Sequence, residues 1–181
     1  MHRQRIELIL VNLLCGGAVL FSYAHGIITH PSAGGALWGD VPRWLMPIYT
    51  GSMLSAAAGY LLFTFFLLFR VNPDEAMIAR RYPYRLFPVL YGAVLVPSAL
   101  WMPLTLWMIT EPSFPLWIAI RIILAAVGIG SIGICAALIL LRPRRDSWTF
   151  RLAVAGAIAF SIQTAILDAL VWTAYFPVGR M

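Results

Sequence analysis

Residues 115–141 read PLWIAIRIILAAVGIGSIGICAALILL, and this stretch decides the fold class of the chain. Arg121 is its only charged residue, and the apolar side chains follow one another without the alternation of an amphipathic strand. A helix rises about 1.5 Å per residue, so a helix of this length can cross the hydrocarbon core of a bilayer, which is about 30 Å thick. The stretch therefore predicts a transmembrane helix.

Four other stretches have the same length and apolar character. They cover residues 6–29, 44–69, 84–109 and 149–176. With 61% hydrophobic and 11% charged residues in a chain of 181, most of the molecule must be solvated by lipid. The apolar runs are continuous, whereas lipid-facing and interior residues alternate in the strands of a membrane barrel. We predict an all-α integral membrane protein in which residues 1–181 form a single domain, a bundle of five transmembrane helices.

The basic residues indicate how this bundle is oriented. All 13 of them are arginines. Ten would lie on one side of the membrane, and these are Arg3, Arg5, Arg70, Arg80, Arg81, Arg85, Arg142, Arg144, Arg145 and Arg151. The opposite side would hold only Arg43 and Arg180. Because cytoplasmic loops carry the basic excess, we expect a cytoplasmic N-terminus and an external C-terminus in a bacterial cytoplasmic membrane. Arginines at helix ends orient a membrane protein, so we expect no nucleic-acid partner.

Local patterns predict further details of the bundle. Asn72-Pro73-Asp74-Glu75 is typical of a helix start, with proline at the first position and acids in the first turn, and predicts a short helix in the second loop. Small residues recur at every fourth position in the second and fifth helices, which favours close contact between helices in lipid. These residues are Gly51, Ser55, Gly59, Ala153, Ala157, Ser161, Ala165 and Ala169.

The third helix contains several prolines, Pro88, Pro97 and Pro103. Each proline removes a backbone donor and leaves a carbonyl without its usual partner. Such groups must be satisfied by neighbours or water inside a membrane. The third helix is therefore expected to line an interior or a cavity, and a purely structural kink is the alternative.

Side chains suited to ligand binding gather toward the outer side of the predicted bundle. The candidates are Trp101, Trp172, Arg121, Asp168, His25, Tyr49, Trp107, Tyr175 and Trp38. Trp and Tyr also collect at membrane interfaces because their rings are amphipathic. Trp101 and Trp172 lie deeper than such a belt, so we expect them to face an internal cavity and to stack on a flat apolar ligand.

Arg121 and Asp168 are oppositely charged and lie at matching depths in the fourth and fifth helices. A charge at such a depth costs at least about 2.5 kcal/mol, so a partner or a wet cavity is expected. Two interpretations remain open. The residues form a structural ion pair between the helices, or they anchor a ligand, with Arg121 facing an anionic group.

The sequence contains no pattern that indicates catalysis or metal binding. The histidines form no i, i+4 pair, Cys15 and Cys135 are not in a Cys-x-x-Cys motif, and no histidine follows Ser131 to activate it. We expect no catalytic residue, no metal ligand and no required cofactor, while a bound tetrapyrrole or lipid is compatible with the chain.

Residues 97–104, Pro-Ser-Ala-Leu-Trp-Met-Pro-Leu, resemble the Asn-x-x-Trp-Ser-x-Phe-Phe core of the tryptophan-rich sensory protein family, which includes the mitochondrial translocator protein. Trp101 stands at the motif tryptophan, and Pro97 stands about where the asparagine belongs. Residues 42–49 resemble the segment that opens the second helix of that family. The resemblance implies a bundle that binds tetrapyrroles, sterol-like lipids or other flat apolar ligands among its five helices, often as a homodimer.

These observations lead to one main functional hypothesis and two alternatives. The main hypothesis is a membrane protein that binds a flat apolar ligand in a cavity of the outer half, for sensing or transport. The first alternative is a membrane enzyme that acts on a lipid or tetrapyrrole, with His25 or Asp168 transferring a proton. The second alternative is a non-catalytic assembly subunit that packs against a larger membrane complex.

Overall fold

The computed structural model describes residues 3–143 and 147–176. Five helices in this part of the chain are long and apolar enough to cross a membrane, as predicted. Three of them are single α-helices, α3 (Met46–Phe69), α4 (Leu86–Thr110) and α5 (Phe114–Ile139). The structure is therefore all-α in its main elements.

The first and last spans are continuous helices that change type along their length. The first contains α1 (Arg3–Val11), the π-helical segment η1 (Asn12–Gly16) and α2 (Gly17–Thr29). The last contains α6 (Trp148–Ser161), the π-helix η4 (Ile162–Trp172) and α7 (Thr173–Tyr175). The sequence analysis did not predict either π-helical segment, because a helix that is apolar on all sides has no periodicity that distinguishes the two helix types.

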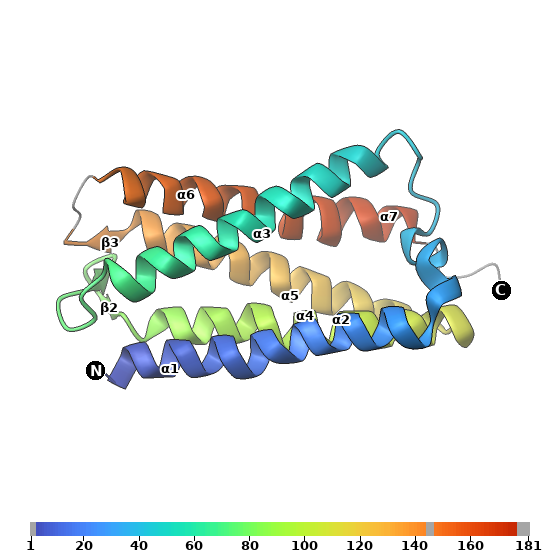
Figure 1. Cartoon of the computed structure of the whole chain (residues 1–181), viewed down its shortest axis with the longest axis horizontal. Helices are drawn as coiled ribbons and strands as arrows, with labels where there is room; N and C mark the ends of the chain where they lie inside the picture. The colour runs from blue at the N-terminus through green and yellow to red at the C-terminus, as the bar shows by residue number, and fades with distance from the viewer. Residues whose placement is uncertain (1–2, 144–146, 177–181) are drawn as a thin grey trace.

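The five spans lie side by side, and the chain reverses direction at each connection (Figure 1). The helix α2 packs on α4, α4 on α5, α5 on both α6 and η4, and α6 on α3. We call the end that holds the start of α1 and the short strands the arginine end. We call the opposite end, with α7 and the 3-10 helices η2 (Pro31–Gly34) and η3 (Ala36–Trp38), the aromatic end.

The closest helix contact joins α3 to α6 at a pair of glycines. A Cβ atom added to Gly156 would lie 2.7 Å from the Cα atom of Gly59 and 2.8 Å from its carbonyl oxygen. A Cβ atom on Gly128 of α5 would lie 2.9 Å from the Cα atom of Ala165 in η4. The small residues predicted to allow close packing therefore do so at Gly59 and at Ala165.

The second loop differs from the prediction of a short helix. Residues 72–76 form a turn, and the chain then enters a small antiparallel sheet of β1 (Met77–Ile78), β2 (Tyr82–Pro83) and β3 (Leu141–Arg142), in the order β2-β1-β3. Ala76 and Ile78 are buried while Met77 is exposed, and this alternation suits a strand. The burial of alternate residues against the bundle therefore overrides the helix-start signal of the proline and acids.

Candidate functional site

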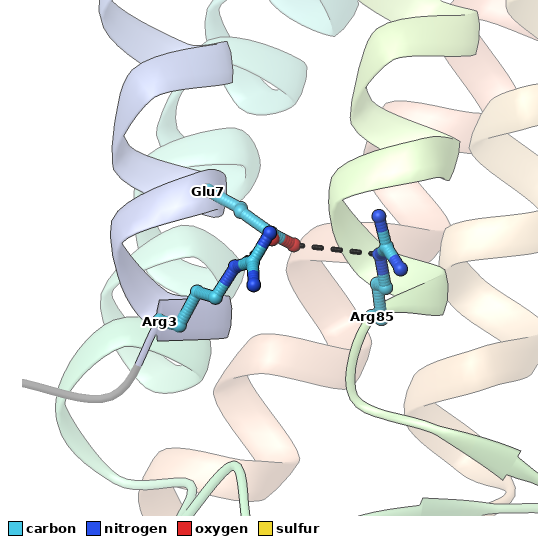
Figure 2. Close-up of polar contacts among 3 residues, drawn as sticks. All are labelled: Arg3, Glu7 and Arg85. Carbon is cyan, nitrogen blue, oxygen red and sulfur yellow. Dashed lines mark ion pairs between the residues drawn. The ribbon is translucent and has the colours of Figure 1, made fainter.

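Arginines accumulate at the end of the bundle that holds the strands. The Arg5 guanidinium donates to the Val71 carbonyl at 3.0 Å. Glu7 lies between Arg3 and Arg85, with N–O distances of 3.4 and 3.6 Å (Figure 2). Arg3 and Arg85 are largely exposed, and exposed ion pairs contribute about 0–1 kcal/mol. These contacts fix the end of the first span but do not form a pocket.

Aromatic rings from several elements meet at the opposite end. Trp101 of α4 lies 5.6 Å from Tyr23 of α2 and 5.7 Å from Trp172 of η4, measured between ring centroids. Trp172 stacks on Phe176 at 4.3 Å, with ring planes only 18° apart. We call Tyr23, Trp101, Trp172 and Phe176 the aromatic cluster. Trp101 and Trp172 therefore face the interior of the bundle, where they contact each other.

The first loop closes over this cluster through hydrogen bonds to the last span. Trp172 donates its indole N–H to the Leu37 carbonyl at 3.0 Å, and the Asp40 amide donates to the Tyr175 carbonyl at 2.8 Å. Gly39 has a φ of 57°, and a Cβ atom there would lie 2.8 Å from the Tyr175 carbonyl oxygen. Glycine is required at this position both for its backbone conformation and for the close approach.

Tyr49 and Trp38 pack beside the cluster. The Tyr49 hydroxyl donates to the Leu167 carbonyl at 2.6 Å, and its ring meets that of Trp38 edge-on at 5.7 Å. Tyr49 is fully buried, whereas Trp38 and Tyr175 are half-buried. These three predicted residues therefore hold α3, the first loop and the last span together.

Among the described residues, Arg121 and Asp168 form no direct ion pair, which was one of the two interpretations that the sequence left open. Arg121 donates to the Thr173 carbonyl at 2.8 Å, and its guanidinium carbon lies 3.8 Å from the ring centroid of Trp117. Trp117 in turn donates to the Phe176 carbonyl at 3.0 Å. Carbonyls at a helix C-terminus lack intrahelical donors and carry partial negative charge, so they attract a cation as a carboxylate would. The matching depths of Arg121 and Asp168 in the sequence could not show whether the partner of Arg121 is a carboxylate or a carbonyl at a helix end.

Asp168 has a different set of neighbours. Its Oδ1 atom accepts a hydrogen bond of 2.8 Å from Gln163 Nε2. The Tyr49 hydroxyl donates to the carbonyl of Leu167, the residue directly before Asp168. Among the described residues, no arginine or histidine forms an ion pair with it.

The π-helix explains why Gln163 and Asp168 meet. The two residues are five positions apart, and in an α-helix neighbours on one face are three or four apart. In a π-helix the backbone repeats from i to i+5, so side chains at this spacing lie one above the other. Both residues belong to η4. The sequence shows the polar pair, but only the helix type brings its members together.

Several buried polar atoms in the middle and at the aromatic end of the bundle lack hydrogen-bond partners within the described part of the chain. They are Trp101 Nε1, Thr105 Oγ1, Arg121 Nε, Ser161 Oγ and Gln163 Oε1. Thr105 is 0% exposed and Gln163 is 4% exposed. Unpaired polar atoms are uncommon in the interior of a folded protein, and they often mark a functional site.

A hollow of about 390 Å³ lies between α2 and α4 at the same end, and we call it the α2/α4 groove. Its lining includes Phe21, Ser22, His25, Pro103, Leu106 and Trp107. His25 is exposed, and its ring centroid lies 5.8 Å from that of Phe21.

A second hollow, of about 610 Å³, is also lined by Trp107. It includes Glu111, which accepts a hydrogen bond from the Trp107 indole at 3.1 Å.

The predicted site residues therefore occupy three neighbouring places. Trp101, Trp172, Tyr49, Trp38 and Asp168 lie at helix and loop contacts, where Tyr49 and Trp172 are buried and the other three are half-buried. His25 and Trp107 line the α2/α4 groove. Arg121 and Tyr175 lie around the end of the last span. Sequence reasoning missed Tyr23, Thr105 and the role of Gln163, although polar side chains inside apolar spans were a signal that pointed to each of them.

Comparisons with protein families, with curated proteins and with solved structures found no match to this chain.

Proposed function

We propose that this protein binds a flat apolar ligand at the aromatic end and acts as a membrane sensor or transporter of that ligand. The observation that carries the proposal is the α2/α4 groove, which is lined by ring side chains and lies between the two helices that carry Tyr23 and Trp101 of the aromatic cluster. Its volume of about 390 Å³ lies within the range of about 300–1,000 Å³ that is usual for small-molecule sites.

The proposed affinity comes from the burial of apolar surface, at about 25 cal/mol per Å². Phe21 and Trp107 would contact the flat faces of the ligand, and Ser22 and His25 would supply polar contacts at the edge of the groove. Tyr23 and Trp101, which contact each other, belong to the same two helices, α2 and α4, and connect the groove region to the rest of the aromatic cluster. Ligands of this shape include tetrapyrroles and sterol-like lipids, in agreement with the resemblance of residues 97–104 to the tryptophan-rich sensory protein family.

The proposal includes an orientation, with the arginine end in the cytoplasm. The described arginines of that end give it the basic excess typical of cytoplasmic loops, and Arg144 and Arg145 lie outside the described residues. The ligand would then enter from the outer half of the bilayer.

A fluorescence experiment tests the site. The purified protein in lipid nanodiscs would be titrated with 1-pyrenemethanol, a flat neutral acceptor of tryptophan energy. We expect saturable energy transfer that falls strongly in a Trp107→Phe, Trp101→Phe double variant. The matched control is Trp44→Phe, Trp148→Phe, which removes two tryptophans that are 70% and 72% exposed. Equal loss of transfer in both double variants would show that the probe is simply dissolved in lipid and would overturn the proposal.

A further inference from the structure

We propose that the ligand of the aromatic end is an organic cation and that the Asp168 carboxylate is its counter-ion. This inference depends on the proposed function and specifies the charge of the ligand. It reverses the expectation of an anionic ligand group facing Arg121.

The first observation is that Asp168 lies inside an apolar span without an ionic partner. Arg121, the arginine expected to neutralise it, is engaged by the Thr173 carbonyl and the Trp117 ring. In the part of the chain that the structure describes, Asp168 accepts only the neutral donor Gln163. A charged carboxylate at membrane depth is costly, and such residues usually mark a functional site. A bound cation would neutralise it.

The second observation is that nearby buried polar atoms offer further acceptors. Gln163 uses its Nε2 atom to donate to Asp168, which leaves its Oε1 atom buried and without a partner among the described residues. Thr105, one helical turn from Trp101 on the same face of α4, likewise has an unpartnered Oγ1 atom. An ammonium group carries donors and no acceptor, so it is complementary to carboxylate, amide and hydroxyl oxygens.

The third observation is the set of aromatic rings at the same end of the bundle. The Tyr49 hydroxyl donates to the carbonyl of Leu167, which directly precedes Asp168, and Trp101 contacts both Tyr23 and Trp172. The faces of Trp and Tyr rings attract cations, and the attraction reaches about 2 kcal/mol or more where water is excluded. A carboxylate at an end of the bundle that is rich in aromatic rings therefore favours a positively charged group that is partly apolar.

These elements also suggest how the ligand is placed. The α2/α4 groove accepts the flat apolar body, and Ser22, which lines the groove, directly precedes Tyr23 on α2. A cationic substituent on that body would extend past Tyr23 and Trp101 toward Asp168. The charge would be held inside the bundle, and the apolar body would remain next to lipid.

The test uses three flat probes of nearly equal size, 1-pyrenemethylammonium, 1-pyrenemethanol and 1-pyrenecarboxylate. Energy transfer from tryptophan would be titrated with each probe in nanodiscs for the wild-type protein, for Asp168→Asn and for Asp40→Asn. Asp40 is the matched control, because it is an exposed carboxylate at the same end. We expect the wild-type protein to bind the ammonium about tenfold more tightly than the alcohol. Asp168→Asn should abolish this preference, and Asp40→Asn should preserve it.

Three results would contradict the inference in distinguishable ways. Equal affinity for the ammonium and the alcohol, or a preference that persists in Asp168→Asn, would overturn the cation site and leave the proposed function intact. Tighter binding of 1-pyrenecarboxylate than of the other two probes would favour Arg121 as the anchor. It would also overturn the cation site. Failure of all three probes to bind the wild-type protein would overturn both proposals. If Asp168→Asn does not fold, Gln163→Met replaces it, and a preference for the ammonium that is unchanged in that variant counts against the inference.

Discussion

The guanidinium of Arg121 contacts one backbone carbonyl and an aromatic ring rather than a carboxylate. It donates to Thr173 at the end of the last span and lies over the ring of Trp117. Asp168 is held by Gln163 and does not share a hydrogen-bond partner with Arg121. The two charged residues should therefore act on stability independently.

A double-mutant cycle tests this independence. Arg121→Leu removes a hydrogen bond from a charged donor and a cation–π contact, so we expect it to destabilise the protein by about 1.5–3 kcal/mol. The effects of Arg121→Leu and Asp168→Leu should add to within about 0.5 kcal/mol when unfolding is measured in mixed micelles. A coupling energy well above about 1 kcal/mol would mean that the two side chains interact.

At the scale of elements, the contact between α3 and α6 depends on one residue without a side chain on each helix. Gly59→Ala would place a methyl group against the Gly156 backbone. Backbone cannot give way as a flexible side chain can, so we expect the two helices to separate or the protein to lose several kilocalories per mole of stability. Gly51→Ala on the same helix is the control, because no atom lies within 4 Å of its added Cβ. Thermal unfolding in detergent should show a large loss for Gly59→Ala and almost none for Gly51→Ala, and similar melting temperatures would argue against the contact.

The hairpin between β1 and β2 turns through two residues in the left-handed region, Ala79 with a φ of 52° and Arg80 with a φ of 57°. This conformation costs a residue with a side chain about 1–2 kcal/mol and suits Asn-Gly. Ala79→Asn combined with Arg80→Gly should therefore raise the melting temperature of the protein. Arg81→Gly, at a neighbouring position without positive φ, should lower it slightly. A lower melting temperature for the first variant would mean that the turn has a different conformation.

The elements also show which features the sequence could predict. Continuous apolar runs predicted the five helices, because about 20 consecutive apolar residues are enough for a helix to span a bilayer. The hairpin was not predicted, because it depends on the burial of Ala76 and Ile78 against helices distant in the chain. The pairing of Gln163 with Asp168 was not predicted either, since a spacing of five places residues together only in a π-helix. The aromatic residues of the site could be identified from the sequence, but their division between the cluster and the groove could not.

For the whole molecule, the uneven distribution of arginine predicts its orientation. A reporter enzyme that is active only outside the cytoplasm should be active when fused after residue 181 or within residues 31–38. The same enzyme should be inactive when fused within residues 72–81. The reverse pattern would place the aromatic end in the cytoplasm, and the ligand would then have to enter from the inner half of the bilayer.

The most direct test of the central claim is photolabelling of the full-length protein in nanodiscs with a flat apolar probe that carries a diazirine, followed by mapping of the labelled residues. The account predicts that labelling concentrates on Phe21–Gly26 of α2 and Trp101–Trp107 of α4, and that an excess of unmodified probe suppresses it. Lipid-facing residues such as Ile122, Ile129 and Ile132 of α5, which are 63%, 72% and 53% exposed, should be labelled weakly and without competition. Labelling spread evenly over these exposed faces, and not reduced by competitor, would contradict a ligand site at the aromatic end.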